Sequence, residues 1–216
     1  MKTDSDLKRE VVAELLWDPA VNSTAIGVGV KNGVVTLTGH LDTYAEKEAA
    51  LRAVRRLQGV KAIAVELDVK LSPQHQRGDT DIVASAELAL KWNTSIPAGA
   101  VRLTVDHGWI TLQGEVEWEF QRRSAEKAIR SLIGVVGVSN EIKLRAKPQP
   151  ADLAKKIEEA LARQALRESK QIQISVDGST VKLTGAVHSW HEREAVQGVA
   201  WAAPGVRAVI NELTIA

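Results

Sequence analysis

The stretch Gly33-Val34-Val35-Thr36-Leu37-Thr38-Gly39 decides the fold, because the chain repeats it twice. Its counterparts are Gly108-Trp109-Ile110-Thr111-Leu112-Gln113-Gly114 and Ser179-Thr180-Val181-Lys182-Leu183-Thr184-Gly185. The closing glycines lie 75 residues (39 to 114) and 71 residues (114 to 185) apart, and the same offsets relate Gly59-Val60, Gly134-Val135 and Gly205-Val206. Two landmarks in fixed register predict three tandem copies of one unit, and these glycines are predicted to be structural.

Hydrophobic periodicity predicts the same elements in each unit. Apolar residues four apart indicate an opening amphipathic helix. They are Leu7, Val11 and Leu15, then Ile82, Ala86 and Leu90, then Leu153, Ile157 and Leu161. Alternating apolar residues, a turn with glycine and further alternation predict two strands joined by a hairpin. Val35 and Leu37 and their counterparts are expected to be buried.

A second helix and a third strand complete the predicted unit. The helix is expected to end at Gly59, Gly134 or Gly205, and the strand in the second unit to carry Val138, Ile142 and Leu144. The order is αββαβ, an α+β fold in which two helices cover one face of a three-stranded sheet. We expect units at residues 1–71, 77–146 and 149–216, joined by short connectors that contain proline, Leu71–Gly78 and Lys147–Pro150.

Composition narrows the classes of function. Apolar residues make up 44% and charged residues 25%, with a formal charge of +1 and no cysteine. No apolar run approaches the ~20 residues of a membrane span, no global charge favours nucleic acid, and no disulfide or thiolate chemistry is possible. The start of the chain lacks the pattern of an export signal, which predicts a cytoplasmic location if it is the natural start and a periplasmic one if a signal was removed.

When the three units are aligned, each set of equivalent residues forms one column. These columns resemble the BON domain family, named for bacterial OsmY and nodulation proteins. The resemblance rests on strands ending V-x-L-x-G, on the following Gly-Val pairs, and on Asn140-Glu141-Ile142 and Asn211-Glu212-Leu213. The first unit departs from it, with Val65 in the asparagine column. It implies an OsmY-like row of non-catalytic modules associated with osmotic and envelope stress and with phospholipid surfaces.

Aromatic residues are the first candidates for a binding site. The second unit has Trp118-Glu119-Phe120-Gln121-Arg122-Arg123, followed by Lys127 and Arg130, and Trp109 points away from the predicted core. Trp190 and Trp201 belong to the last unit, where Trp201 fills the column of Arg55 and Arg130 and is expected to face protein. Tryptophan beside cations suits a headgroup boundary or a partner surface, but tryptophans also cover cores and domain junctions.

Two further clusters of side chains are considered as ion-binding sites. Glu66, Glu141 and Glu212 fill one column of the third strand, which predicts either a solvated face or a charged ring around an axis. His188 and His191, with Glu192 nearby, form the closest histidine pair, but the spacing straddles a turn and predicts no metal site.

No catalytic motif is present, so we expect a protein that is not an enzyme and has no cofactor. The leading hypothesis is a stress-associated protein that binds anionic phospholipid or a protein partner. The alternative is a homo-oligomeric carrier or receptor for ions or small solutes, with a passage lined by the glutamate column. Oligomeric state separates these hypotheses, because a strict monomer has no such passage.

Overall fold

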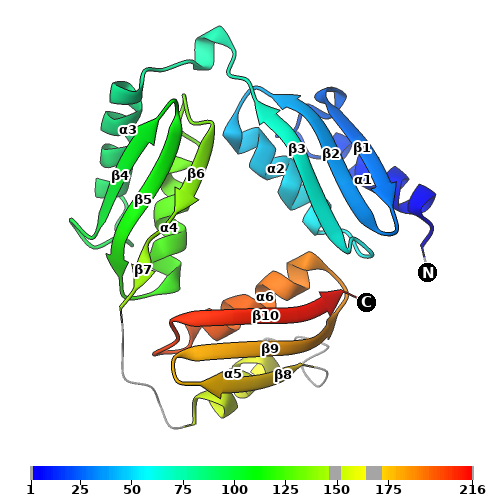
Figure 1. Cartoon of the computed structure of the whole chain (residues 1–216), viewed down its shortest axis with the longest axis vertical. Helices are drawn as coiled ribbons and strands as arrows, with labels where there is room; N and C mark the ends of the chain where they lie inside the picture. Colours follow the sequence, from blue (N-terminus) through cyan, green and yellow to red (C-terminus); the bar gives the residue numbers. More distant parts are fainter. Residues whose placement is uncertain (1, 146–151, 164–171, 216) are drawn as a thin grey trace.

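Each third of the chain folds into a three-stranded sheet covered by two helices, as predicted (Figure 1). The computed structural model describes residues 2–145, 152–163 and 172–215. The predicted connector at 147–150 therefore lies outside the described residues.

The three units have matching elements. Unit 1 contains α1 (Asp4–Trp17), β1 (Ile26–Lys31), β2 (Val34–Leu41), α2 (Tyr44–Arg55) and β3 (Ala62–Val69). Unit 2 contains α3 (Asp79–Lys91), β4 (Val101–Asp106), β5 (Trp109–Val116), α4 (Glu119–Ile129), β6 (Gly137–Asn140) and β7 (Lys143–Leu144). Unit 3 contains α5 (Leu153–Arg163), β8 (Gln173–Asp177), β9 (Thr180–Val187), α6 (Trp190–Ala202) and β10 (Ala208–Ile215).

The second strand of each unit is the centre of its sheet. It pairs antiparallel with the first strand through the hairpin and parallel with the third strand through the crossover helix. Its inward side chains are completely buried: Val35, Leu37, Ile110, Leu112, Val181 and Leu183. Each such burial contributes about 1.5–3 kcal/mol, so the repeated stretch holds the core of each unit.

The third strand of unit 2 differs from the predicted single strand, because it is divided into β6 and β7. Just before the break, Asn140 Nδ2 donates to Arg122 O at 3.0 Å and to Glu126 Oε2 at 3.1 Å. Asn140 Oδ1 accepts from Ile142 N at 3.3 Å. Asn211 accepts in the same way from Leu213 N at 3.2 Å. The asparagine of the family pattern therefore ties the third strand to the second helix.

The second helices end earlier than predicted, at Arg55, Ile129 and Ala202. A short turn follows, and the expected glycines come after it with φ of 90° at Gly59, 94° at Gly134 and 88° at Gly205. The left-handed conformation that favours glycine is therefore present, but it belongs to the turn before the third strand rather than to the helix cap.

The three units form a triangle in which equivalent elements take equivalent places (Figure 1). The second helices α2, α4 and α6 and the third strands lie towards the middle, and α3 and α5 lie towards the outside. The arrangement approximates threefold symmetry within one chain, so residues in one sequence column occupy similar positions around a common axis.

Gly39 provides a test of this framework. Its φ is 129°, and an added Cβ would lie 2.1 Å from Ala25 O, whereas one added at Gly29 meets nothing nearer than Thr36 Cβ at 3.8 Å. We expect Gly39→Ala to lower the free energy of unfolding by more than about 2 kcal/mol and Gly29→Ala to change it by less than about 1 kcal/mol. Urea denaturation followed by circular dichroism measures both, and equal effects would contradict the close approach.

Candidate functional site

The first residue of each second helix lies against the next unit around the triangle. Tyr44 of unit 1 packs against the core of unit 2, and Trp190 of unit 3 packs against the core of unit 1. Glu119 of unit 2 lines a cavity together with Trp201 and Ala202 of unit 3. The contacts run in one direction, from 1 to 2, 2 to 3 and 3 to 1, so the three units close a ring.

An arginine–glutamate pair supports two of the three junctions. Arg130 of α4 lies 3.8 Å from Glu48 of α2, and Arg55 of α2 lies 3.2 Å from Glu194 of α6. The two pairs use equivalent columns of the repeat. At the junction of units 2 and 3 the same columns hold Trp201 in place of the arginine and Arg123 in place of the glutamate. This junction therefore lacks the ion pair of the other two.

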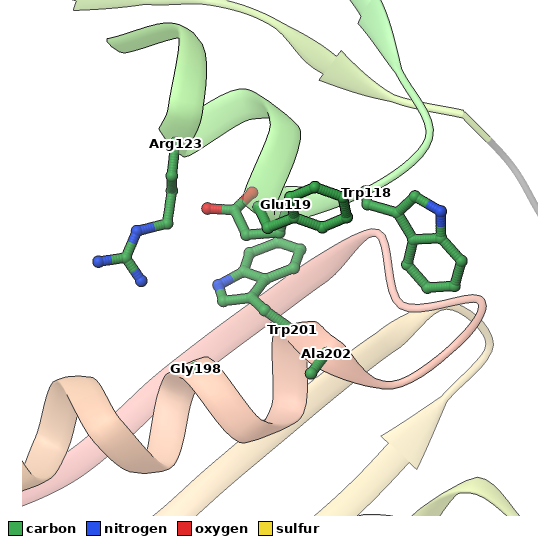
Figure 2. A pocket seen from close by; sticks show the side chains of 7 residues that line it. Trp118, Glu119, Arg123, Gly198, Trp201 and Ala202 are labelled. Carbon is green, nitrogen blue, oxygen red and sulfur yellow. The ribbon is translucent and has the colours of Figure 1, made fainter. Parts of the chain in front are cut away.

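A cavity of about 360 Å³ lies at this junction, between α4 and α6 (Figure 2). Figure 2 shows Trp201 reaching from α6 towards α4, with Glu119 and Arg123 close by and Trp118 at the opposite side. We call it the junction cavity, and its lining residues are Trp118, Glu119, Phe120, Arg123, Gly198, Trp201 and Ala202. Three aromatic rings and a guanidinium thus surround one opening.

Trp118 occupies a position where local structure favours a different residue. Thr43 and Ser189 hold the equivalent N-cap positions, and their hydroxyls accept from Glu46 N at 3.2 Å and Glu192 N at 3.1 Å. Tryptophan has no oxygen for this bond, and replacing such a cap costs about 1 kcal/mol. Gln121 Oε1 instead accepts from Trp118 N at 3.1 Å. Helix capping does not explain Trp118, whereas its place in the lining of the cavity does.

Arg122 also differs from its counterparts. Lys47 donates to Leu67 O at 2.7 Å, and Arg193 donates to Asn211 O at 2.6 Å, so both bind the third strand of their own unit. Arg122 lies instead over the ring of Trp201, with 5.2 Å from Cζ to the ring centroid, and donates to Glu119 Oε1 at 3.0 Å. The interruption between β6 and β7 accompanies this change, and Arg122 serves the junction rather than the sheet.

Glu119 is the one buried charged side chain among the described residues, and its burial was not predicted. Burial raises the pKa of its carboxyl above the ordinary value, while the hydrogen bond from Arg122 opposes the shift. Its Oε2 lies 2.7 Å from Arg122 Nε but receives no well-aligned hydrogen bond. Only the repeat could have pointed to Glu119, because its column holds aromatic residues in units 1 and 3.

The other predicted binding residues lie in separate places. Phe120 is 56% exposed at the junction cavity, and Lys127 is exposed on α4. Trp109 lies on the open face of its sheet, where its Nε1 donates to Ser139 Oγ at 2.9 Å. Trp190 and Trp201 face neighbouring units. The predicted cluster is therefore divided, and Trp118, Phe120, Arg123 and Trp201 remain together.

Two members of the carboxylate column have partners inside their own units. Gln113 Nε2 donates to Glu141 at 2.9 Å, and Lys182 lies 2.9 Å from Glu212, while Glu66 is exposed on β3. Within the described ranges no three histidine or acidic side chains gather as metal ligands would, around His188 and His191 or elsewhere. Nor does any described helix combine the length and apolarity that crossing a bilayer requires.

Comparison with known proteins identifies the repeat. The BON domain family matches residues 3–70, 78–146 and 150–216. The chain belongs to the BON domain family. It is 27% identical over 146 residues to osmotically-inducible protein Y of Escherichia coli (strain K12), which covers 66% of this chain and 73% of the relative.

Solved structures of CdsD, a structural protein of the type III secretion system of Chlamydia trachomatis, also match these BON units. One is 16% identical and covers 98% of this chain and 92% of its own, with a TM-score of 0.27. Another is 15% identical and covers all of both chains, again with a TM-score of 0.27.

Tyr44 reports on the closed ring, because it is the only tyrosine of the chain. Burial raises its pKa to about 12, and the carboxylates of Glu48 and Glu126 add to the shift. The pKa is higher in the folded chain than the ordinary value of about 10, so the neutral phenol stabilises the fold below pH ~10, and this contribution is lost as the pH rises towards 12. We expect absorbance at 295 nm to titrate near pH 12 in the native chain and near pH 10 in urea.

Glu48→Gln is the companion variant for this titration. It removes a negative charge beside Tyr44, so the native midpoint should move towards 10 while the midpoint in urea stays unchanged. A native midpoint near 10 in the unaltered chain would show that Tyr44 does not lie in the junction.

Proposed function

We propose that this BON protein is a non-enzymatic binding protein of the osmotic stress response that attaches to anionic phospholipid surfaces through the junction cavity. The observation that carries the proposal is the grouping of Trp118, Phe120 and Trp201 beside Arg123 at the one junction that lacks an ion pair. Aromatic rings suit the boundary between headgroups and acyl chains, and a guanidinium beside them attracts phosphate.

The departures from the repeat support a binding role for this junction. Trp118 replaces a capping hydroxyl, Arg123 replaces a glutamate, and Trp201 replaces an arginine. Each change removes a contact that the equivalent residues of the other two units make, and all three residues line one cavity. The loss of stabilising contacts at one place in an otherwise regular repeat is typical of a functional site.

The name of the Escherichia coli relative, osmotically-inducible protein Y, supports the link to osmotic stress. A protein partner on the same aromatic surface is the other occupant that the chemistry allows. An oligomeric carrier has less support, because Glu141 and Glu212 are engaged within their own units.

Vesicle flotation tests the proposal. We expect the full chain to float with vesicles of phosphatidylglycerol at low salt, and much less with vesicles of phosphatidylcholine. Phe120→Ala combined with Arg123→Ala should weaken binding by at least about tenfold, because one aromatic anchor and one cation are lost. Arg123 is chosen over Arg122, whose contacts with Glu119 and Trp201 are part of the structure.

Trp92→Ala is the matched control, since this side chain is 78% exposed at the end of α3 and does not line the junction cavity. Its binding should equal that of the unaltered chain. If neither kind of vesicle binds, a phospholipid role is refuted. If binding is unaffected by the double substitution, the site is wrong.

A further inference from the structure

A second cavity of about 650 Å³ lies where the three second helices meet. Residues of α2, α4 and α6 all line it, so every unit contributes to this one space. We call it the axial cavity, because these helices surround the middle of the triangle (Figure 1). It shares Glu119, Phe120, Arg123, Gly198 and Trp201 with the junction cavity, so the two spaces adjoin.

The four carboxylates that line the axial cavity are all engaged. Glu48 and Glu194 are paired with the arginines of the two ion pairs, and Glu119 is bound by Arg122. Glu126 accepts from Asn140 Nδ2 at 3.1 Å. Three of the four negative charges are therefore balanced by an arginine, whereas Glu126 has only a neutral amide as its partner.

Three cations of the lining have no such partner among the described residues: Arg52, Arg123 and Lys127. Arg52 and Lys127 are exposed, and neither forms a hydrogen bond or an ion pair with the residues that the structure describes. They occupy one column of the repeat, and the third member of that column is Gly198, which places no side chain in the cavity. Arg123 lines the same space, so positive charge is left unbalanced beside an open position.

We propose that the axial cavity binds a phosphate group between Arg52 and Lys127. A guanidinium presents a fork of donors to phosphate oxygens, and an ammonium adds a compact charge. An anion between them would relieve the repulsion of two like charges that line one space. The space left open at Gly198 accommodates it. This site does not depend on the attachment to phospholipid surfaces.

Calorimetric titration of the full chain with inorganic phosphate, against chloride at equal ionic strength, tests the site. We expect phosphate to bind and Arg52→Gln or Lys127→Gln to weaken binding about tenfold each, as loss of a charge-assisted hydrogen bond predicts. Lys127→Arg should retain binding, because it keeps a cation at this position. The control is Lys91→Gln with Arg207→Gln, two exposed cations outside the cavity, which should bind like the unaltered chain.

Flotation with phosphatidylglycerol vesicles distinguishes a lipid headgroup from free phosphate. If free phosphate does not bind but Arg52→Gln with Lys127→Gln abolishes flotation and the control pair does not, the phosphate group is that of a lipid headgroup, which enters from the junction cavity. If phosphate binds and vesicles do not, the axial site stands while the proposed attachment to phospholipid fails. If the double substitution changes neither measurement, the axial site is refuted.

Discussion

The contact between the first residue of each second helix and the next unit is the interaction on which the rest of the arrangement depends. Units of about 70 residues bury a small core, so surface covered by a neighbour adds a substantial share of their stability. Tyr44 and Trp190 provide this cover with aromatic rings. Glu119 provides it with a carboxylate that must be balanced by Arg122. The third contact therefore differs in chemistry from the other two, which are aromatic.

The different chemistry of this junction accounts for the position of both cavities, which adjoin there. With a glutamate at position 123 and an arginine at position 201, an ion pair like those of Arg55 and Arg130 would support the junction of units 2 and 3. The chain instead has a cation and an indole there, and Arg122 covers the indole. Two junctions are therefore closed by ion pairs, and the third has the aromatic and charged groups through which we propose that the protein binds its ligand.

The fold of each unit could be predicted from the sequence, because buried apolar residues follow the period of a helix or a strand. Leu37, Leu112 and Leu183, which are buried in the second strands, are examples. The sequence also indicated that Trp201 faces protein, since its column holds arginines elsewhere. It could not place Glu119 or Tyr44 at junctions, because those contacts join units and follow no local period. The predicted cationic cluster counted Arg122 and Arg130 as available, whereas Arg122 lies over Trp201 of unit 3 and Arg130 is paired with Glu48 of unit 1.

The unequal junctions respond in opposite directions to dissolved ions. Salt screens exposed pairs such as Arg55 with Glu194, so rising ionic strength weakens both contacts of this kind that unit 1 makes. Ions excluded from protein surfaces strengthen apolar contact, so the indole of Trp201 is held more firmly. Ionic strength therefore acts on the two ion-paired junctions of unit 1, while the aromatic contacts of Tyr44, Trp190 and Trp201 persist at high salt.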